Sequence, residues 1–233
     1  INILNSLDAE LPNYGHLPMV LSNSGKRLSK RDGAIDILDY KKNGYLKESI
    51  INYLAKLGWS HSDKEIFSID ELLDLFSLEA VNSSPAKFSD ELLNYYNNYY
   101  LKKINLDDLI SMIENNFLDD EKFKMLLKKR EIIELERESS NNILEMTESL
   151  NFYYQKPFIS DDLKANISID IKYLNNFIRE IEQIKFEKEE IENFIKSFLQ
   201  RENLKFPELG KPLRIILTGK TNAPSITELF YLI

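Results

Sequence analysis

Most of the chain carries apolar residues at the spacing of three and four positions that is typical of amphipathic helices. Leu46, Ile50, Leu54 and Leu57 follow this spacing, and Gly58 comes directly after them. This pattern predicts a helix that ends at the glycine. The same reasoning predicts helical segments within residues 1–13, 68–76, 89–100, 105–113, 119–130, 132–154, 160–184, 187–202 and 225–233.

Capping residues and prolines mark the boundaries of several of these helices. Ser68 is followed three positions later by a glutamate, which is the capping-box pattern that satisfies the first free N–H groups of a helix. Ser225 begins the last helix in the same way. Pro157 and Pro207 interrupt the helical pattern, because proline lacks the N–H group that a helix interior requires. One short run, Leu17–Leu21, is typical of a β-strand, so we expect a mainly α fold with a small α/β or irregular segment near the N-terminus.

The composition supports a helical protein with a substantial core. The 233 residues are 43% hydrophobic and include only seven glycines and seven prolines, which favours long helices over a β-rich or disordered chain. The sequence has no cysteine and only two histidines, so we expect neither a disulfide framework nor a metal site. No apolar run approaches the length of a membrane span. We therefore expect a cytoplasmic, monomeric protein that does not bind membranes.

One short stretch of strong positive charge stands out in this acidic chain. Residues 26–33, Lys-Arg-Leu-Ser-Lys-Arg-Asp-Gly, carry four cationic side chains, whereas the formal net charge of the whole chain is −8. Asn23-Ser24-Gly25 predicts a tight turn before the stretch, and Gly33 gives backbone freedom after it. The natural ligand of such a loop is a polyanion, either a nucleotide triphosphate or a nucleic-acid backbone. On charge alone, a solvated surface loop is the simpler interpretation.

The residues around this stretch resemble one family. The resemblance runs in order through Gly15–Leu21, Arg27–Ala34, Gly44–Leu46, Ile51–His61 and Glu65–Phe67, and a second patch covers Pro212–Thr221 with Pro224. Both patches are similar to the C-terminal half of bacterial-type glutamyl-tRNA synthetases, which are class I aminoacyl-tRNA synthetases. The run Arg27-Leu28-Ser29-Lys30-Arg31 falls on the KMSKS-type signature loop of that family, which usually reads Lys-Leu-Ser-Lys-Arg.

The resemblance implies which parts of such an enzyme are present. These enzymes activate glutamate in an N-terminal domain with a His-Ile-Gly-His-type motif, and this sequence contains no such motif. We therefore expect a fragment that is inactive by itself. Residues 1–103 would form the signature loop and a helical domain that contacts the tRNA stem. Residues 104–233 would form an all-helical anticodon-binding domain, which could divide into two subdomains near residue 160.

The resemblance also assigns roles in the parent enzyme to residues of the loop. Lys30 is the expected catalytic cation, because a charge placed near the leaving pyrophosphate stabilises the transition state more than the bound ATP. Arg27 and Arg31 would hold phosphates, and Ser29 would donate a hydrogen bond. The backbone of Val20 would contact adenine. ATP and Mg²⁺ are thus expected in the parent reaction, with neither held tightly by this chain.

Three basic residues are candidates for contacts with tRNA. Arg137 lies roughly where the family uses an arginine to read the third anticodon base, although two extra residues change the local spacing. Arg214 and Lys220 belong to the C-terminal patch and could meet phosphates. For Arg214, an ion pair with a carboxylate inside the helical domain is an equally good interpretation.

The prediction is the tRNA-binding half of a glutamate–tRNA ligase, with tRNA(Glu) as its partner and with ATP and L-glutamate as substrates of the parent. A non-catalytic RNA-binding or scaffold protein is the alternative from another class, but a scaffold has no use for Ser29 and Lys30 in a phosphate-closing loop. A synthetase that also charges tRNA(Gln) is a nearer alternative. The residues that would discriminate it lie in the weakly matched middle of the chain, so the sequence leaves this choice open.

Overall fold

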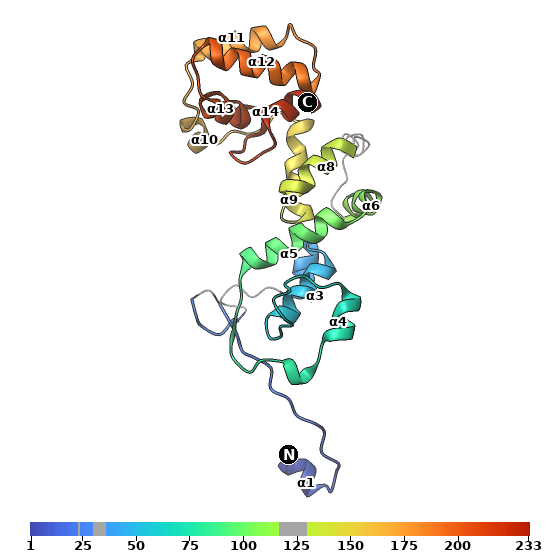
Figure 1. Ribbon diagram of the computed structural model, residues 1–233. Coiled ribbons are helices and arrows are strands. Elements are labelled where there is room, and N and C mark those ends of the chain that lie inside the picture. The colour runs from blue at the N-terminus through green and yellow to red at the C-terminus, as the bar shows by residue number, and fades with distance from the viewer. Residues whose placement is uncertain (23, 30–35, 117–129) are drawn as a thin grey trace. The chain divides into compact units, whose positions relative to one another are not determined.

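The computed structural model describes residues 1–22, 24–29, 36–116 and 130–233. The chain forms two compact units, Ile1–Tyr100 and Leu101–Ile233, and each is considered by itself below. Helices dominate both units, and the described residues contain a single sheet of two strands (Figure 1). The predicted mainly α fold is confirmed. No helix in the described part of the chain is both long and apolar enough to cross a membrane.

The first unit combines short helices with the small sheet. Its elements are α1 (Asn2–Ser6), β1 (Val20–Leu21), α2 (Ile37–Lys42), α3 (Lys47–Lys56), α4 (Ile69–Leu75), the 3-10 turn η2 (Leu78–Ala80), β2 (Ala86–Lys87) and most of α5 (Asp90–Lys103). The two strands run parallel, with Val20 opposite Ala86 and Leu21 opposite Lys87. The predicted strand at Leu17–Leu21 is therefore present but shorter, because its partner β2 has only two residues.

Buried side chains from α3 and α5 form one core of the first unit, and residues around α4 form another. The first core contains Ile50, Tyr53, Leu93 and Tyr96. The second contains Trp59, Phe67 and Leu72. The capping box predicted at Ser68 is confirmed, since its hydroxyl accepts a hydrogen bond from the N–H of Glu71 and the Glu71 carboxylate accepts one from the N–H of Ser68. Local sequence therefore fixes where α4 begins, and the buried face fixes how it packs.

Gly58 follows the end of α3, as predicted, but for a different physical reason. The helix ends at Lys56, and Gly58 is not among the glycines with a positive φ angle. A Cβ atom at Gly58 would lie 2.6 Å from Cγ of Pro18. Close approach of the N-terminal segment, rather than a left-handed cap, therefore requires glycine at this position.

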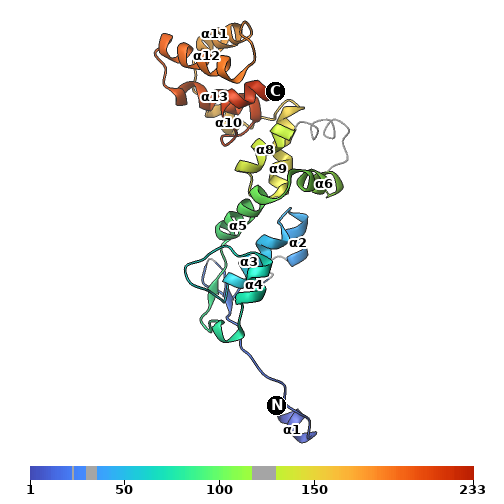
Figure 2. The same cartoon turned by 45° about the vertical axis from the view of Figure 1, so that its right-hand side comes forward.

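The second unit is built entirely from helices in its described part. It contains the end of α5, α6 (Leu106–Asn116), α8 (Arg130–Ser139), α9 (Ile143–Leu150), the 3-10 turn η3 (Asn151–Tyr153), α10 (Asp161–Ala165), α11 (Ile171–Ile181), α12 (Lys188–Arg201), α13 (Phe206–Thr218) and α14 (Ile226–Leu232). Helices α8 and α9 lie side by side, as do α11 and α12, in both Figure 1 and Figure 2. A core from α11 to α14 includes Phe177, Ile191, Phe198 and Leu213.

Two of the helical segments predicted in this unit are each divided in the structure. The segment 132–154 becomes α8 and α9 because Asn142 caps a new helix, with its side chain accepting a hydrogen bond from the N–H of Glu145 at 2.8 Å. The segment 160–184 becomes α10 and α11, and the carboxylate of Asp170 caps the second of them. Ser225 caps α14 as predicted. The segment predicted at 119–130 lies almost wholly outside the described residues.

Helix α13 was not predicted, because its sequence contains two prolines and a glycine. Pro207 stands in the first turn, where the missing N–H group has no helical partner anyway. Pro212 lies inside the helix and is buried, so the packing of the core stabilises a helix that local propensity disfavours. This helix positions the C-terminal patch of the sequence.

Candidate nucleic-acid interface

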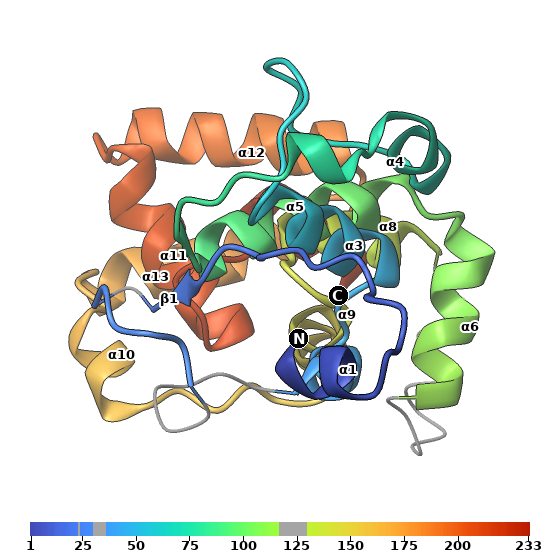
Figure 3. The same ribbon diagram turned by 90° about the horizontal axis from the view of Figure 1, so that it is seen from below.

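The basic stretch of the first unit begins in a tight turn after β1, the strand labelled in Figure 3. The N–H of Ser22 donates to the carbonyl of Lys26 at 2.7 Å, and the N–H of Gly25 donates to the carbonyl of Ser22 at 2.9 Å. Gly25 has a φ angle of 78°, which favours glycine. The predicted turn is therefore present at Ser24 and Gly25.

The turn presents the first part of the signature motif. Arg27 is exposed and forms an isolated antiparallel bridge with Leu21, and its side chain has no ion-pair partner among the described residues. Ser29 is half-buried. The carbonyl of Val20 accepts a hydrogen bond from the N–H of Leu28 at 2.9 Å, so this carbonyl is already engaged within the turn. The remaining candidates in the motif, Lys30 and Arg31, lie outside the described residues, as does Gly33.

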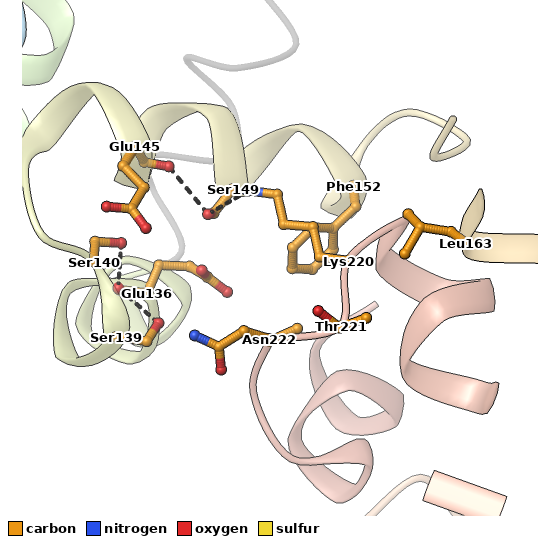
Figure 4. Close-up of a pocket in the computed structure, with 11 residues that line it drawn as sticks. Glu136, Ser139, Ser140, Glu145, Ser149, Phe152, Leu163, Lys220, Thr221 and Asn222 are labelled. Atoms are coloured by element: carbon orange, nitrogen blue, oxygen red, sulfur yellow. Dashed lines mark hydrogen bonds between the residues drawn. The ribbon is translucent and has the colours of Figure 1, made fainter. Parts of the chain in front are cut away.

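A polar pocket lies in the second unit between α8, α9 and the loop that follows α13. Its volume is about 310 Å³. Figure 4 shows the side chains that surround it. The lining residues are Glu136, Ser139, Ser140, Glu145, Ser149, Phe152, Leu163, Lys220, Thr221, Asn222 and Ala223.

The carboxyl group of Glu136 is the most deeply buried charged group in this lining. Glu136 is 2% exposed and follows Ile132 and Ile133 on the buried face of α8, at the spacing of one helical turn. The hydroxyl of Tyr153 donates a hydrogen bond to its Oε1 at 2.8 Å. Its side chain points from α8 toward the loop that carries Lys220 (Figure 4). A buried acceptor is thus fixed in place at the wall of the pocket.

Burial controls the protonation of this pair. Loss of solvation raises the pKa of Glu136, while the hydrogen bond from Tyr153 and the charge of Lys220 act to lower it. Burial, with the neighbouring charge of Glu136 as the next cause, also raises the pKa of Tyr153 far above its usual value. The phenol therefore stays protonated and remains a donor to Glu136 at neutral pH.

Lys220 reaches the pocket through the turn that ends α13. Gly219 ends the helix in the left-handed conformation, with a φ angle of 69°, and its N–H donates to the carbonyl of Ile215 at 2.8 Å. The Nζ atom of Lys220 then donates to Oγ of Ser149 on α9 at 2.9 Å. The pocket lining therefore combines the buried carboxyl group of Glu136, the half-buried carboxyl group of Glu145 and the half-buried ammonium group of Lys220.

Arg137 is adjacent to Glu136 in the sequence but is not part of the pocket lining. Its Nη1 donates to the carbonyl of Ile104 at 3.3 Å, and its side chain is only 16% exposed. Its Nε atom is buried and has no hydrogen-bond partner among the described residues. Arg137, which the sequence predicts to read a base, thus contacts the carbonyl of Ile104 between α5 and α6 and the carboxylate of Glu134, one position away from a residue that does face the pocket.

Arg214 supports the pocket loop instead of forming an ion pair. Its Nε donates to the carbonyl of Pro224 at 3.2 Å, and no carboxylate pairs with it in the described part of the chain. Of the two interpretations of Arg214, the ion pair inside the helical domain is not present among the described residues, where the loop backbone accepts the hydrogen bond of its Nε. Pro224 follows Ala223, which lines the pocket, so Arg214 helps to fix the course of the loop.

The sequence predicts Lys220 as a functional residue, but Glu136 was not predicted. A usable signal was present, since a glutamate four positions after Ile132 lies on the apolar face of an amphipathic helix. A charged group at such a position must find a partner or a function. No group of three or more Asp, Glu or His side chains among the described residues is placed to hold a metal ion, and we assign no step of a reaction to one.

Two family models match the chain. "tRNA synthetases class I (E and Q), catalytic domain" matches residues 1–95, and "Anticodon binding domain" matches residues 87–233. The boundary between the two matches lies near the boundary between the two structural units.

Curated relatives and solved structures agree with these family matches. The chain is 38% identical to the glutamate–tRNA ligase of Nitrosomonas eutropha over 237 residues, and 38% identical to a glutamate–tRNA ligase of Coxiella burnetii over 241 residues. In both cases all of this chain aligns with 51% of the relative. The chain thus spans about half the length of the curated relatives it matches.

The fold is also similar to that of solved enzymes of this kind. A glutamate–tRNA ligase from Elizabethkingia meningosepticum, crystallised with its amino acid, matches 99% of the chain with a TM-score of 0.71 and 25% identity. The glutamate–tRNA synthetase of Elizabethkingia anophelis matches all of the chain with a TM-score of 0.71 and 27% identity. In each case the chain covers 50% of the solved structure. Since the anticodon-binding model matches residues 87–233, which is more than half of the chain, the chain belongs to that family, and the relatives it matches over its whole length are glutamate–tRNA ligases.

Proposed function

We propose that this chain is the tRNA-binding half of a glutamate–tRNA ligase. The complete enzyme would join glutamate to tRNA(Glu) through glutamyl-adenylate, with ATP and Mg²⁺. The observation that carries this proposal is the similarity of the entire chain to half of such ligases at 38% identity. The chain alone would be inactive, because the motif that activates glutamate in the family is absent from its sequence. We also expect it to be a monomer.

The first unit would supply the loop that closes over the triphosphate of ATP. Arg27 is exposed on the tight turn after β1, which suits a side chain that must reach a phosphate. Negative charge grows on the leaving pyrophosphate as adenylate forms, so a cation near that group lowers the barrier. Lys30 is the proposed catalytic cation, with Arg31 and Ser29 as further phosphate contacts.

The second unit would bind the anticodon. The match of residues 87–233 to an anticodon-binding family supports this, and residues 104–233 remain our proposed boundaries for the domain. Proteins read RNA sequence chiefly from bases that leave the stack and expose their edges. The pocket beside Lys220 offers the polar groups that an exposed base requires, and Lys220 and Arg214 are our candidates for contacts with the RNA.

Replacing Lys30 in the complete ligase tests this proposal. We expect Lys30→Ala to lower the rate of adenylate formation about a hundredfold or more, and to leave the affinity for tRNA nearly unchanged, because the contact acts mainly in the transition state. Glutamate-dependent pyrophosphate exchange measures the first quantity, and filter binding measures the second.

Lys26→Ala is the matched control. Lys26 is an exposed lysine of the same turn, outside the signature motif, so its replacement should spare adenylate formation. If Lys30→Ala loses tRNA affinity while adenylate formation is spared, Lys30 is an RNA contact and the proposed role of the loop is wrong. A complete gene product that binds tRNA but never charges it would favour the scaffold alternative.

A further inference from the structure

The pocket of the second unit contains a buried carboxyl group that the proposed loop chemistry does not use. Glu136 is 2% exposed, and yet it lies at the wall of a polar pocket rather than inside the helical core. Its main-chain carbonyl accepts hydrogen bonds from Oγ of Ser140 at 2.8 Å and from Oγ of Ser139 at 3.3 Å. The two serines thus cap the helix end through the main chain, and the side chain of Glu136 takes no part in that cap.

The hydrogen bonding of the pocket leaves Glu136 room for a donor from outside. Tyr153 supplies one donor to Oε1 of Glu136, whereas a carboxylate has room for about four hydrogen bonds. Across the pocket, the ammonium group of Lys220 is directed to Ser149. Glu145, the other acidic residue of the lining, also accepts one hydrogen bond, from the N–H of Asn141 at 3.0 Å, but it is only half-buried, so water can solvate its carboxylate. Glu136 is therefore the acceptor that a ligand entering the pocket would meet.

The chemistry of this acceptor selects among the parts of an RNA. A phosphate would be repelled by the carboxylate, and a base edge with a keto oxygen would set two acceptors against each other. An exocyclic amino group would donate directly to it, as cytosine does to acidic side chains in nucleic-acid complexes. A volume of about 310 Å³ is at the lower end of the range of ligand pockets, and this suits a single base better than a stacked pair.

We propose that Glu136 is a specificity-determining residue, whose carboxylate accepts a hydrogen bond from the amino group of one unstacked base of the bound RNA. Tyr153 is then a positioning residue, since its hydroxyl holds Oε1 and thereby orients the carboxylate toward the pocket. This inference rests on the proposed function, because it takes RNA as the ligand of the second unit. It adds the identity of the residue that recognises a base and the chemical group of the base that this residue recognises.

The test uses the 233-residue chain and a series of RNA hairpins that carry the anticodon loop of tRNA(Glu). In each hairpin, one loop base with an amino group is replaced by its keto counterpart, cytidine by uridine or adenosine by inosine. For the unaltered chain, one such replacement should weaken binding about tenfold or more. Glu136→Gln should abolish that difference at the same loop position, because the glutamine amide can accept from an amino group through its oxygen or donate to a keto oxygen through its N–H group.

Glu131→Gln is the matched control, since it removes the same charge from the same helix at an exposed side chain outside the pocket. Tyr153→Phe should reduce the discrimination in part, and thermal unfolding of each variant verifies that it is folded. The proposal is overturned if no amino-to-keto replacement weakens binding, or if Glu136→Gln keeps the discrimination, or if it weakens binding to every hairpin equally. If the unaltered chain binds no RNA at all, the proposed function itself fails.

Discussion

At the scale of single residues, the buried carboxyl group of Glu136 links the stability of the second unit to pH. Burial raises its pKa above the ordinary value of 4.5, so the folded state holds this proton more tightly than the unfolded chain does. The stabilisation is fully present below pH 4.5 and is lost as the pH rises through the higher folded pKa. Stability from this group therefore falls toward neutral pH.

Glu136→Gln should reveal this dependence, because glutamine fills the same space and does not ionise. We expect the free energy of unfolding of the variant, relative to that of the unaltered chain, to increase between acid and neutral pH. Urea denaturation at several pH values measures the difference. Glu131→Gln gives the baseline for an exposed glutamate on α8. If the free energy of unfolding of Glu136→Gln changes with pH only as much as that of the control, burial of the Glu136 carboxyl group does not destabilise the protein at neutral pH.

At the scale of elements, the end of α13 depends on a glycine that the loop before α10 approaches closely. A Cβ atom at Gly219 would lie 2.6 Å from the carbonyl oxygen of Phe158 and 3.3 Å from Cβ of Pro157. The φ angle of 69° is itself unfavourable for a residue with a side chain. Both effects would destabilise the turn that places Lys220 at the pocket.

Gly219→Ala should therefore destabilise the protein by about 2–4 kcal/mol, since the backbone conformation and the clash act together. Urea denaturation followed by circular dichroism measures this loss. Gly15→Ala is the control, because no atom lies within 4 Å of the added Cβ and its φ angle is not positive, and it should change stability by less than about 0.5 kcal/mol. Equal effects of the two substitutions would contradict the described turn.

At the scale of the whole molecule, a net charge of −8 requires that any binding of tRNA be concentrated at local basic sites. We expect the isolated chain to bind tRNA weakly. Its affinity should fall about tenfold to a hundredfold for a fourfold rise in salt, which corresponds to two to four neutralised phosphates. Filter binding over a salt series gives this slope.

The isolated chain should also show no glutamate-dependent pyrophosphate exchange in the same preparations. An acidic reference protein of similar size is the control for non-specific retention of tRNA. Exchange by the chain alone would show that the activation chemistry does not require the other half of the ligase. A flat salt response would mean that phosphate contacts do not hold the RNA.

The positions of many helices could be predicted, because the capping residues and apolar spacing that indicate them act over a few residues of the chain. The capping serines at positions 68 and 225 act on N–H groups three residues away, and the apolar spacing of α3 needs only its own turn-to-turn repeat. The segments 132–154 and 160–184 were predicted too long, because Asn142 and Asp170 act as caps within an unbroken helical pattern. Helix α13 was missed, because the burial of Pro212 in the core outweighs its poor helix propensity.

The sequence by itself determined the mainly helical class, the turn that presents the basic loop, and the family. These depend on neighbouring residues or on the linear order of a motif. Tertiary structure alone decided that Glu136 faces a pocket while Arg137 turns to Ile104. It also decided that Gly219 must stay small beside Phe158. Each of these facts is a contact between segments distant in the chain, and the hydrophobic spacing of one helix does not specify which distant segment will cover it.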